Sequence, residues 1–143
     1  MTDDRRVARI VAIKRRMSEA RRAEVRDTAA TVAKAESVAA RARRVRGELM
    51  ARIEAQGRTT ASELAILAEL SEIARRDAAG AHDELERARG LHADMTNRAA
   101  HAQRELRVFE SLQERIDEQR RADDRVREQA QCDEAATRKG GEK

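Results

Sequence analysis

Few residues in this chain of 143 have the types and spacing that chemistry needs. His82, His92 and His101 are nine or ten residues apart, whereas two metal ligands on one helix favour positions i and i+4. Cys132 is the single cysteine and has no histidine near it in sequence, so a free thiol is favoured over a nucleophile. No glycine-rich phosphate loop of the G-x-x-x-x-G-K type occurs. We therefore expect no enzymatic activity, no metal and no cofactor.

The composition is typical of long helices rather than of a conventional globular core. Charged residues make up 41% of the chain, proline is absent, and Phe109 is the single aromatic residue. There is no apolar run of about 18 residues that could cross a membrane, and the first residues lead into no apolar signal segment. We therefore expect a soluble, cytoplasmic protein without direct membrane insertion.

In the second half, apolar residues recur at alternating steps of three and four from Leu64 to Ile116. This is the spacing of a coiled-coil seam, and disordered segments do not keep it over seven heptads. Thirteen of the 16 positions are apolar and six of them are alanine, so a partner helix can approach closely. His92 occupies one polar position. The seam residues that we single out here are Leu64, Leu67, Leu85, Met95, Leu106 and Phe109.

The first half carries two apolar stripes with helical spacing. The first runs from Val7 to Ala20 and includes Ile10 and Met17. The second begins at Val25, and the residues that we single out in it are Val25, Val32, Leu49 and Ile53. Because five residues separate Ala20 from Val25, we interpret the offset as a stutter, a local change in the supercoil.

A single turn separates the two halves. Gly57 can take the left-handed conformation that ends a helix, and Thr60-Ala61-Ser62-Glu63 has the pattern of a capping box. If the chain folds back at this turn, residue i should face a residue numbered about 117 minus i. In this register large seam residues of one half face large seam residues of the other. The sequence therefore predicts an all-α fold, a long antiparallel two-helix coiled-coil hairpin whose second helix is longer than the first. A dimer of such chains is the alternative.

The predicted hairpin is one domain over residues 1–139. It consists of a first helix at about 3–56, a turn at 57–60 and a second helix at about 61–137, followed by a flexible tail at 140–143. The second helix should extend past the first beyond about Gln113. Because an isolated polar helix is marginal in water, we expect this extension to fray in the free protein and to become ordered on a partner.

The charges are unevenly distributed. Residues 1–56 hold 15 Lys and Arg against 8 Asp and Glu, whereas residues 57–143 hold 16 against 19. A basic first half favours pairing with the acidic second half and leaves a basic face for an acidic partner. The basic runs alternate with carboxylates, and aromatic residues that could stack on bases are lacking, so we expect no nucleic-acid binding.

The end of the second helix carries two motifs. Leu112-Gln113-Glu114-Arg115 is followed about twenty residues later by Asp133-Glu134-Ala135-Ala136-Thr137-Arg138-Lys139. This pattern resembles the carboxyl-terminal part of the FliJ-like and YscO-like (SctO) proteins, which are small stalk components of flagellar and virulence type III export machines. The chain departs from the flagellar members in its near absence of aromatic residues, which favours a virulence-type member.

The resemblance implies a non-enzymatic stalk that binds and stimulates the hexameric export ATPase and links it to the membrane export gate. It also implies that such a protein can escort secretion chaperones, lies in the cytoplasm at the secretion apparatus of the inner membrane, and is a monomer when free. The residues that it assigns to ATPase binding are Leu112, Gln113, Glu114, Arg115, Ile116, Asp133, Glu134, Arg138 and Lys139. The alternative is a generic coiled-coil scaffold or tether, for which a dimer is expected, and a basic nucleic-acid-binding protein is a third, less favoured alternative.

Overall fold

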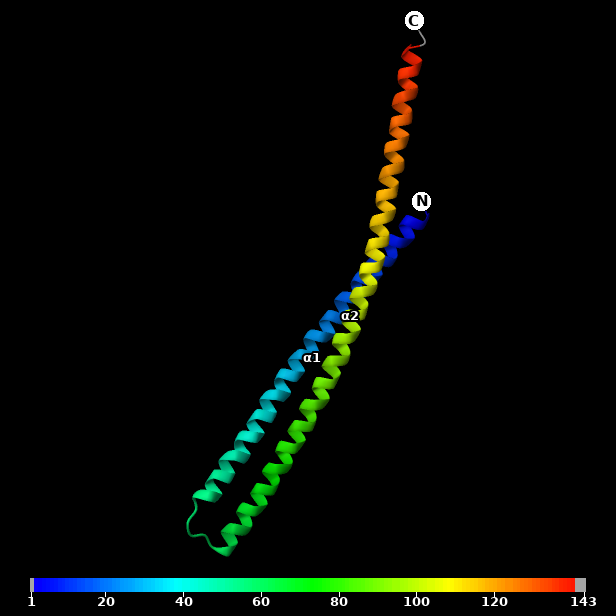
Figure 1. Ribbon diagram of the computed structural model, residues 1–143. Coiled ribbons are helices and arrows are strands. Elements are labelled where there is room, and N and C mark those ends of the chain that lie inside the picture. Colours follow the sequence, from blue (N-terminus) through cyan, green and yellow to red (C-terminus); the bar gives the residue numbers. More distant parts are fainter. Residues whose placement is uncertain (1, 141–143) are drawn as a thin grey trace. The chain divides into compact units, whose positions relative to one another are not determined.

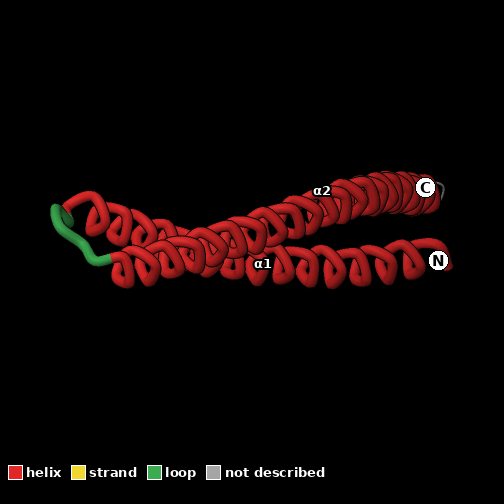
Figure 2. Tube along the Cα trace, turned by 90° about the horizontal axis from the view of Figure 1, so that it is seen from below, coloured by secondary structure: helices red, strands yellow, loops and turns green. Residues whose placement is uncertain are grey.

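The computed structural model describes residues 2–140, and the side chains of residues 4–138. Within this range the chain forms two α-helices, α1 (Thr2–Ala55) and α2 (Ala61–Gly140), joined by one loop (Figures 1 and 2). Proline is absent, so nothing along either helix removes a backbone N–H donor or forces a kink. The predicted all-α fold with a longer second helix is confirmed. Of the predicted tail, Gly140 ends α2 and residues 141–143 lie outside the described residues.

The start of α2 is held by the predicted capping box. The Thr60 backbone N–H donates to Glu63 Oε2 at 2.9 Å, and the Glu63 N–H donates to Thr60 Oγ1 at 3.3 Å. The hydrogen bond from the Thr60 N–H is the largest cause that lowers the pKa of the Glu63 carboxyl, because it favours the charged form. The end of α1 differs from the prediction, since Gly57 does not take a left-handed conformation. Five residues between Ala55 and Ala61 reverse the chain without it.

The helix contacts group into two compact units, which we describe separately. The turn unit comprises Ala20–Ala99, and the end unit comprises the chain up to Glu19 together with the chain from Ala100 onward. In each unit, segments of α1 and α2 pack antiparallel (Figure 1), which confirms the predicted helical hairpin.

Buried positions follow the predicted seam on α2. Every predicted position from Leu67 to Ile116 is buried or half-buried, whereas Leu64 is exposed. The buried apolar residues of the turn unit are Ala39, Ala74, Ala78 and Leu85, and those of the end unit are Val11 and Leu106. Most of the core of the turn unit is therefore alanine, and its helices have room to approach closely.

The apolar stripe predicted from Val7 to Ala20 is not the buried face of α1 in this segment. Met17 is 44% exposed and Ile13 is 51% exposed, while Val11 and Ser18 are buried to 2% and 3% exposure. The buried and half-buried seam positions of α1 continue the spacing of Val25 backwards at alternating steps of three and four, so the burial pattern contains no stutter. The seam positions on this path are Val7, Val11, Lys14, Ser18, Arg21, Val25, Thr28, Val32, Ala35, Ala39, Ala42, Leu49 and Ile53. The sequence hid this path because polar residues occupy part of it.

Polar contacts between α1 and α2 show the register in which the two helices pack. The numbers of the paired residues add up to 119 for Lys14–Glu105 and to 120 for Thr28–His92, and pairs with arginine reach 125. These sums exceed the predicted value of about 117 in the direction expected of antiparallel helices. Side chains lean toward the N-terminus of their own helix. Two side chains whose tips touch therefore start from residues whose numbers add up to more than those of residues with facing backbones.

Candidate functional site

The carboxyl-terminal part of α2 extends past the amino-terminal part of α1 within the end unit (Figure 1). An ion pair of 3.7 Å between Arg120 Nη1 and Asp4 Oδ2 lies near the start of this extension. All residues from 117 to 138 are exposed. We call residues 117–138 the overhang. Its first turn still meets α1 at the Asp4–Arg120 pair, whereas the rest has no second helix of the described chain beside it and its side chains are open to a partner.

The structure divides the first motif between two environments. Leu112 is 43% exposed, and Glu114 and Arg115 are exposed as well. Gln113 and Ile116 lie on the seam and are half-buried. Ile116 also lines two surface grooves together with Asp4 of α1. Of the two apolar residues in this segment, Leu112 is therefore the one that a partner can reach without disturbing the hairpin.

The second motif is exposed on the overhang. Asp133, Glu134 and Arg138 are all exposed, and Arg138 Nη2 donates to Glu134 Oε1 at 2.6 Å, one helical turn away. Thr137 Oγ1 donates to the backbone carbonyl of Asp133 at 2.7 Å. Lys139 lies in α2, and its side chain is outside the described residues.

Leu112, Arg115 and Ile116 share a face of α2 with the second motif but lie far from it along the helix, whereas Glu114 lies on the opposite face. Eighteen residues make five turns of an α-helix, so Glu134 lies in phase with Ile116, and Asp133 with Arg115. At a rise of 1.5 Å per residue, Leu112 and Arg138 are about 39 Å apart. The motif residues therefore form a long strip on one helix and not a pocket, which suits contact with a protein surface rather than binding of a small molecule.

A cluster of polar contacts fastens α1 to α2 in the end unit. Lys14 Nζ donates to Glu105 Oε2 at 2.7 Å and lies 5.8 Å from the centre of the Phe109 ring. The hydrogen bond from Lys14 is the largest cause that lowers the pKa of the Glu105 carboxyl, followed by its positive charge. His101 Nε2 lies 3.2 Å from Glu105 Oε1 on the same helix. Glu105 is thus a shared acceptor at the centre of this cluster.

Two further bonds extend the cluster along the same segment of α1. Ser18 Oγ, which is buried, donates to Gln103 Oε1 at 2.9 Å. Arg15 Nε donates to Glu110 Oε1 at 2.9 Å. We call these contacts, with the Lys14–Glu105 pair, the polar clamp. Exposed ion pairs stabilise weakly and are screened by salt, so the clamp fixes the register of the end unit more than it adds stability.

The sequence did not reveal the polar clamp, although a signal for it was present. Steps of three and four taken backwards from Val25 reach Ser18 and Lys14. The apolar residues Ile13 and Met17 drew the predicted seam to the neighbouring face instead. Hydrophobicity was a poorer guide to the seam than constant helical spacing was.

Two of the residues first considered for chemistry, His92 and Cys132, lie on the helix seam and on the overhang. His92 is half-buried on the seam, and its Nδ1 lies 2.9 Å from Thr28 Oγ1, as expected of a polar seam residue. Cys132 is an exposed free cysteine of the overhang. Among the described residues, no group of three histidine, cysteine or acidic side chains is placed to hold a metal ion. The described helices also include none with the length and apolar character needed to cross a membrane.

The resemblance to FliJ-like and YscO-like proteins rests on the two motifs on α2, of which the second is exposed and the first is partly buried at Gln113, next to the half-buried Ile116. Within the end unit, α1 lies beside the first motif but not beside the second, because the contacts of α1 with α2 reach only to about Arg120. The chain matches no family model, no curated protein and no solved structure.

Proposed function

We propose that the protein is a non-enzymatic stalk component of a type III export apparatus, of the virulence or flagellar kind. In this role α2 binds and stimulates the hexameric export ATPase through the exposed strip from Leu112 to Arg138. The loop between α1 and α2 and the helix segments beside it, Leu49–Leu70, contact the export gate, and secretion chaperones are further partners. The protein then acts in the cytoplasm at the inner membrane.

The observation that carries this proposal is the overhang. Residues 117–138 are helical, and after Arg120 they have no second helix of the described chain beside them; they hold 5 Arg against 7 Asp and Glu. A helix of this kind gains little stability from its own residues, so a partner surface that orders it provides a reason for its length. Its motif residues Asp133, Glu134 and Arg138 are those that carry the resemblance.

Co-elution with the export ATPase of the same organism, together with ATP hydrolysis with and without this protein, tests the proposal. We expect the full chain to co-elute and to raise the hydrolysis rate. Deletion of residues 121–143 begins after the Asp4–Arg120 pair, so it removes the overhang and leaves the described contacts between the helices. This deletion should abolish both effects.

A point substitution separates binding from folding. Leu112→Asp places a charge on the strip at a residue that is 43% exposed, and Met50→Asp makes the same change at a residue of the turn unit that is 41% exposed. We expect the first variant to lose ATPase binding and the second to keep it, with equal helix content by circular dichroism. Binding that survives both the deletion and Leu112→Asp would contradict the proposal. Ile116 is unsuitable for this test because it is half-buried beside α1.

A generic coiled-coil tether is the second candidate, and one observation favours it. The turn unit exposes large apolar side chains outside the seam, among them Val45, Leu70 and Ile73. Such a stripe is expected of a chain that joins others through helix packing. A folded chain that neither co-elutes with the ATPase nor stimulates it would leave the tether as the better supported function.

A further inference from the structure

The turn unit has a second apolar stripe beside its seam. Each of its large residues is about half exposed and directly precedes a position with the spacing of the seam; for Val45 this position is Arg46, which is itself exposed. On α1 these residues are Val38 at 52% and Val45 at 53%, and on α2 they are Ile66 at 59%, Leu70 at 46%, Ile73 at 48% and Leu91 at 49%. A single exposed leucine needs no explanation, but repeated exposure at one helical phase on both helices does.

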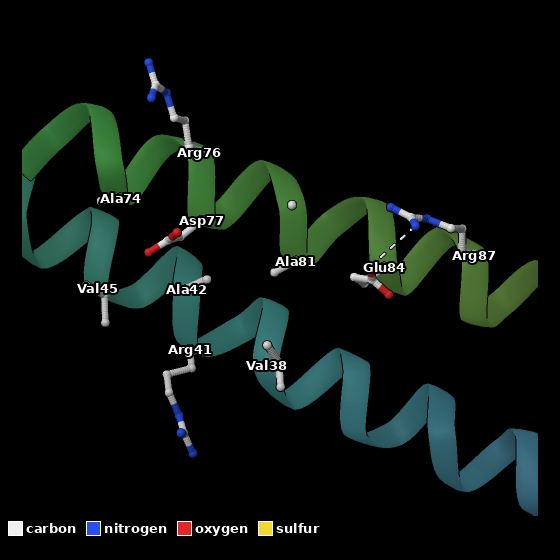
Figure 3. Close-up of a pocket in the computed structure, with 11 residues that line it drawn as sticks. Val38, Arg41, Ala42, Val45, Ala74, Arg76, Asp77, Ala81, Glu84 and Arg87 are labelled. Atoms are coloured by element: carbon white, nitrogen blue, oxygen red, sulfur yellow. Dashed lines mark ion pairs between the residues drawn. The ribbon is translucent and has the colours of Figure 1, made fainter.

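The stripes of the two helices border one groove. Val38, Val45 and Ala42 of α1 line it together with Ala74 and Ala81 of α2 (Figure 3). A second, adjoining groove is lined by Val45, Leu49, Leu70 and Ile73 among others. Gly80 also lines the first groove, and a Cβ atom built there would meet nothing within 4 Å. The first groove therefore has a floor of small residues and an apolar edge on α1, and the adjoining groove has apolar residues on both helices.

This arrangement has the residue pattern of a bundle with more than two helices. A helix that contacts one neighbour needs one narrow apolar seam, whereas a helix in a bundle has apolar residues at a flanking position as well. The flanking positions of α1 and α2 are apolar at Val38, Val45, Leu70 and Ile73, although the hairpin leaves them exposed. The helices that would cover them have to come from another chain.

The charges along the groove indicate which chain. Arg41 on the α1 edge and Asp77 on the α2 edge lie at nearly the same level of the groove (Figure 3), and neither has an ion pair within the described part of the chain. Arg52 is basic on the α1 edge as well, and Glu84 is acidic on the α2 edge, where it also pairs with Arg87 at 3.5 Å. Glu48 is the exception on the α1 edge, and the exceptions on the α2 edge are Arg76 and Arg87, which pair with Glu72 and Glu84 of their own helix.

We propose that the groove of the turn unit binds a second copy of this chain, so that two hairpins form an antiparallel four-helix bundle. A two-fold axis parallel to the helices sets the α1 edge of one copy on the α2 edge of the other. This operation brings Arg41 of each copy to Asp77 of the other and packs Val38 and Val45 against the side of α2 that carries Gly80 and Ile73. The surface is self-complementary in charge as well as in apolar pattern.

This proposal does not depend on the function proposed above. It involves residues 20–99, whereas the ATPase contact is placed on the strip from Leu112 to Arg138. With the proposed gate contact, Leu49–Leu70, the groove shares Leu49, Arg52 and Leu70 at its loop end. The monomer expected for the free protein was implied by the resemblance, and the seam itself left a dimer open as the alternative. With the stripe exposed on both helices, the dimer is the state that removes it from water.

The mass of the full chain in solution tests the proposal. Sedimentation equilibrium over roughly a thousandfold range of protein concentration should show a species of twice the chain mass of 16.1 kDa that dissociates on dilution. Ile73→Glu places a charge in the groove at a residue that the hairpin leaves 48% exposed, so the variant should stay folded. We expect its dimer dissociation constant to rise at least about tenfold.

Matched variants separate this face from other exposed apolar residues. Met50→Glu changes a residue of the same unit that is 41% exposed and follows a seam position instead of preceding one, so it should leave the dimer intact. Arg41→Glu should weaken the dimer roughly twofold to fivefold, and adding Asp77→Arg should restore it. A monomer at every concentration overturns the proposal. So does a dimer that Ile73→Glu leaves unchanged, or one that Met50→Glu weakens equally.

Discussion

The end unit and the turn unit join the same two helices by different means. In the turn unit the buried seam is small and apolar, with Ala39, Ala74 and Ala78 around Leu85. In the end unit a buried serine and a lysine occupy seam positions and bond to α2 through Gln103 and Glu105. Apolar packing stabilises without strict geometry, whereas hydrogen bonds require their partners in register.

This difference suits two tasks. Alanine knobs let the helices of the turn unit approach closely and leave the flanking stripe to form the edges of a groove. The polar clamp fixes where the amino-terminal segment of α1 sits on α2, and thereby where the overhang begins. Because its contacts respond to salt and acid, the end unit should also be the more readily opened of the two.

The largest expected effect comes from removing the one large buried residue of the turn unit. Leu85 is 4% exposed, and Leu85→Ala should lower the free energy of unfolding by about 2–3 kcal/mol, because the surrounding alanines cannot fill the cavity. Circular dichroism in a denaturant series at one fixed protein concentration measures this change.

The matched substitution Leu106→Ala sharpens the comparison. Leu106 is 7% exposed in the end unit, and its loss should accelerate amide hydrogen exchange in that unit while the turn unit keeps its protection. Leu85→Ala should accelerate exchange across the turn unit. Equal acceleration in both units by either variant would show that the two seams open together and that the comparison fails.

A smaller effect is expected from the buried hydroxyl of the polar clamp. Ser18→Val removes the donor to Gln103 Oε1 and should cost about 1 kcal/mol, because the amide oxygen loses its buried partner. Gln103→Leu should cost less in the Ser18→Val background than in the original chain, because the Ser18–Gln103 hydrogen bond is already lost there. Unfolding free energies of the two single variants and the double variant measure the coupling.

The corresponding change in the turn unit is Thr28→Val. The Thr28 hydroxyl lies 2.9 Å from His92 Nδ1, but it also donates to backbone carbonyls of its own helix and is only half-buried. We therefore expect a smaller cost than for Ser18→Val. A larger cost for Thr28→Val would mean that the turn unit too depends on a polar contact.

The sequence predicted most of the fold because helical spacing on α2 is regular. Steps from Leu67 to Ile116 identified the buried face, and Thr60 with Glu63 identified the start of α2. The register and the seam of α1 were harder to predict. Lys14 and Ser18 are polar, so hydrophobicity assigned the seam to Ile13 and Met17, although constant spacing contradicted that choice.

The candidate site could be predicted only in part. The motif residues Asp133, Glu134 and Arg138 were expected on an extension of α2, and they lie there, exposed. Ile116 was both the last predicted seam position and a residue assigned to ATPase binding, and it lies half-buried beside α1, as the seam spacing predicted. The groove of the turn unit was not predicted, because its edges are made by residues of both helices.

The smallest expected effect is the response of the polar clamp to acid. The folded protein lowers the pKa of Glu105 below its ordinary value of 4.5, mainly through the hydrogen bond from Lys14. The stabilisation from this pair is therefore complete above pH 4.5 and is lost as the pH falls through the lowered pKa. In the turn unit the pKa of Glu72 is lowered to about 2, mainly by Arg75 on the same helix, so its protonation at lower pH does not loosen a contact between helices.

Acidification from pH 5 to pH 3 should therefore raise exchange in the end unit before it does so in the turn unit, after correction for the intrinsic pH dependence of exchange. Glu105→Gln cannot gain the proton and should abolish this early step. Glu128→Gln, which changes an exposed carboxylate of the overhang, should retain it. An early step that persists in Glu105→Gln would place the acid-sensitive contact elsewhere, and the Arg15–Glu110 and Asp4–Arg120 pairs would be the next to test.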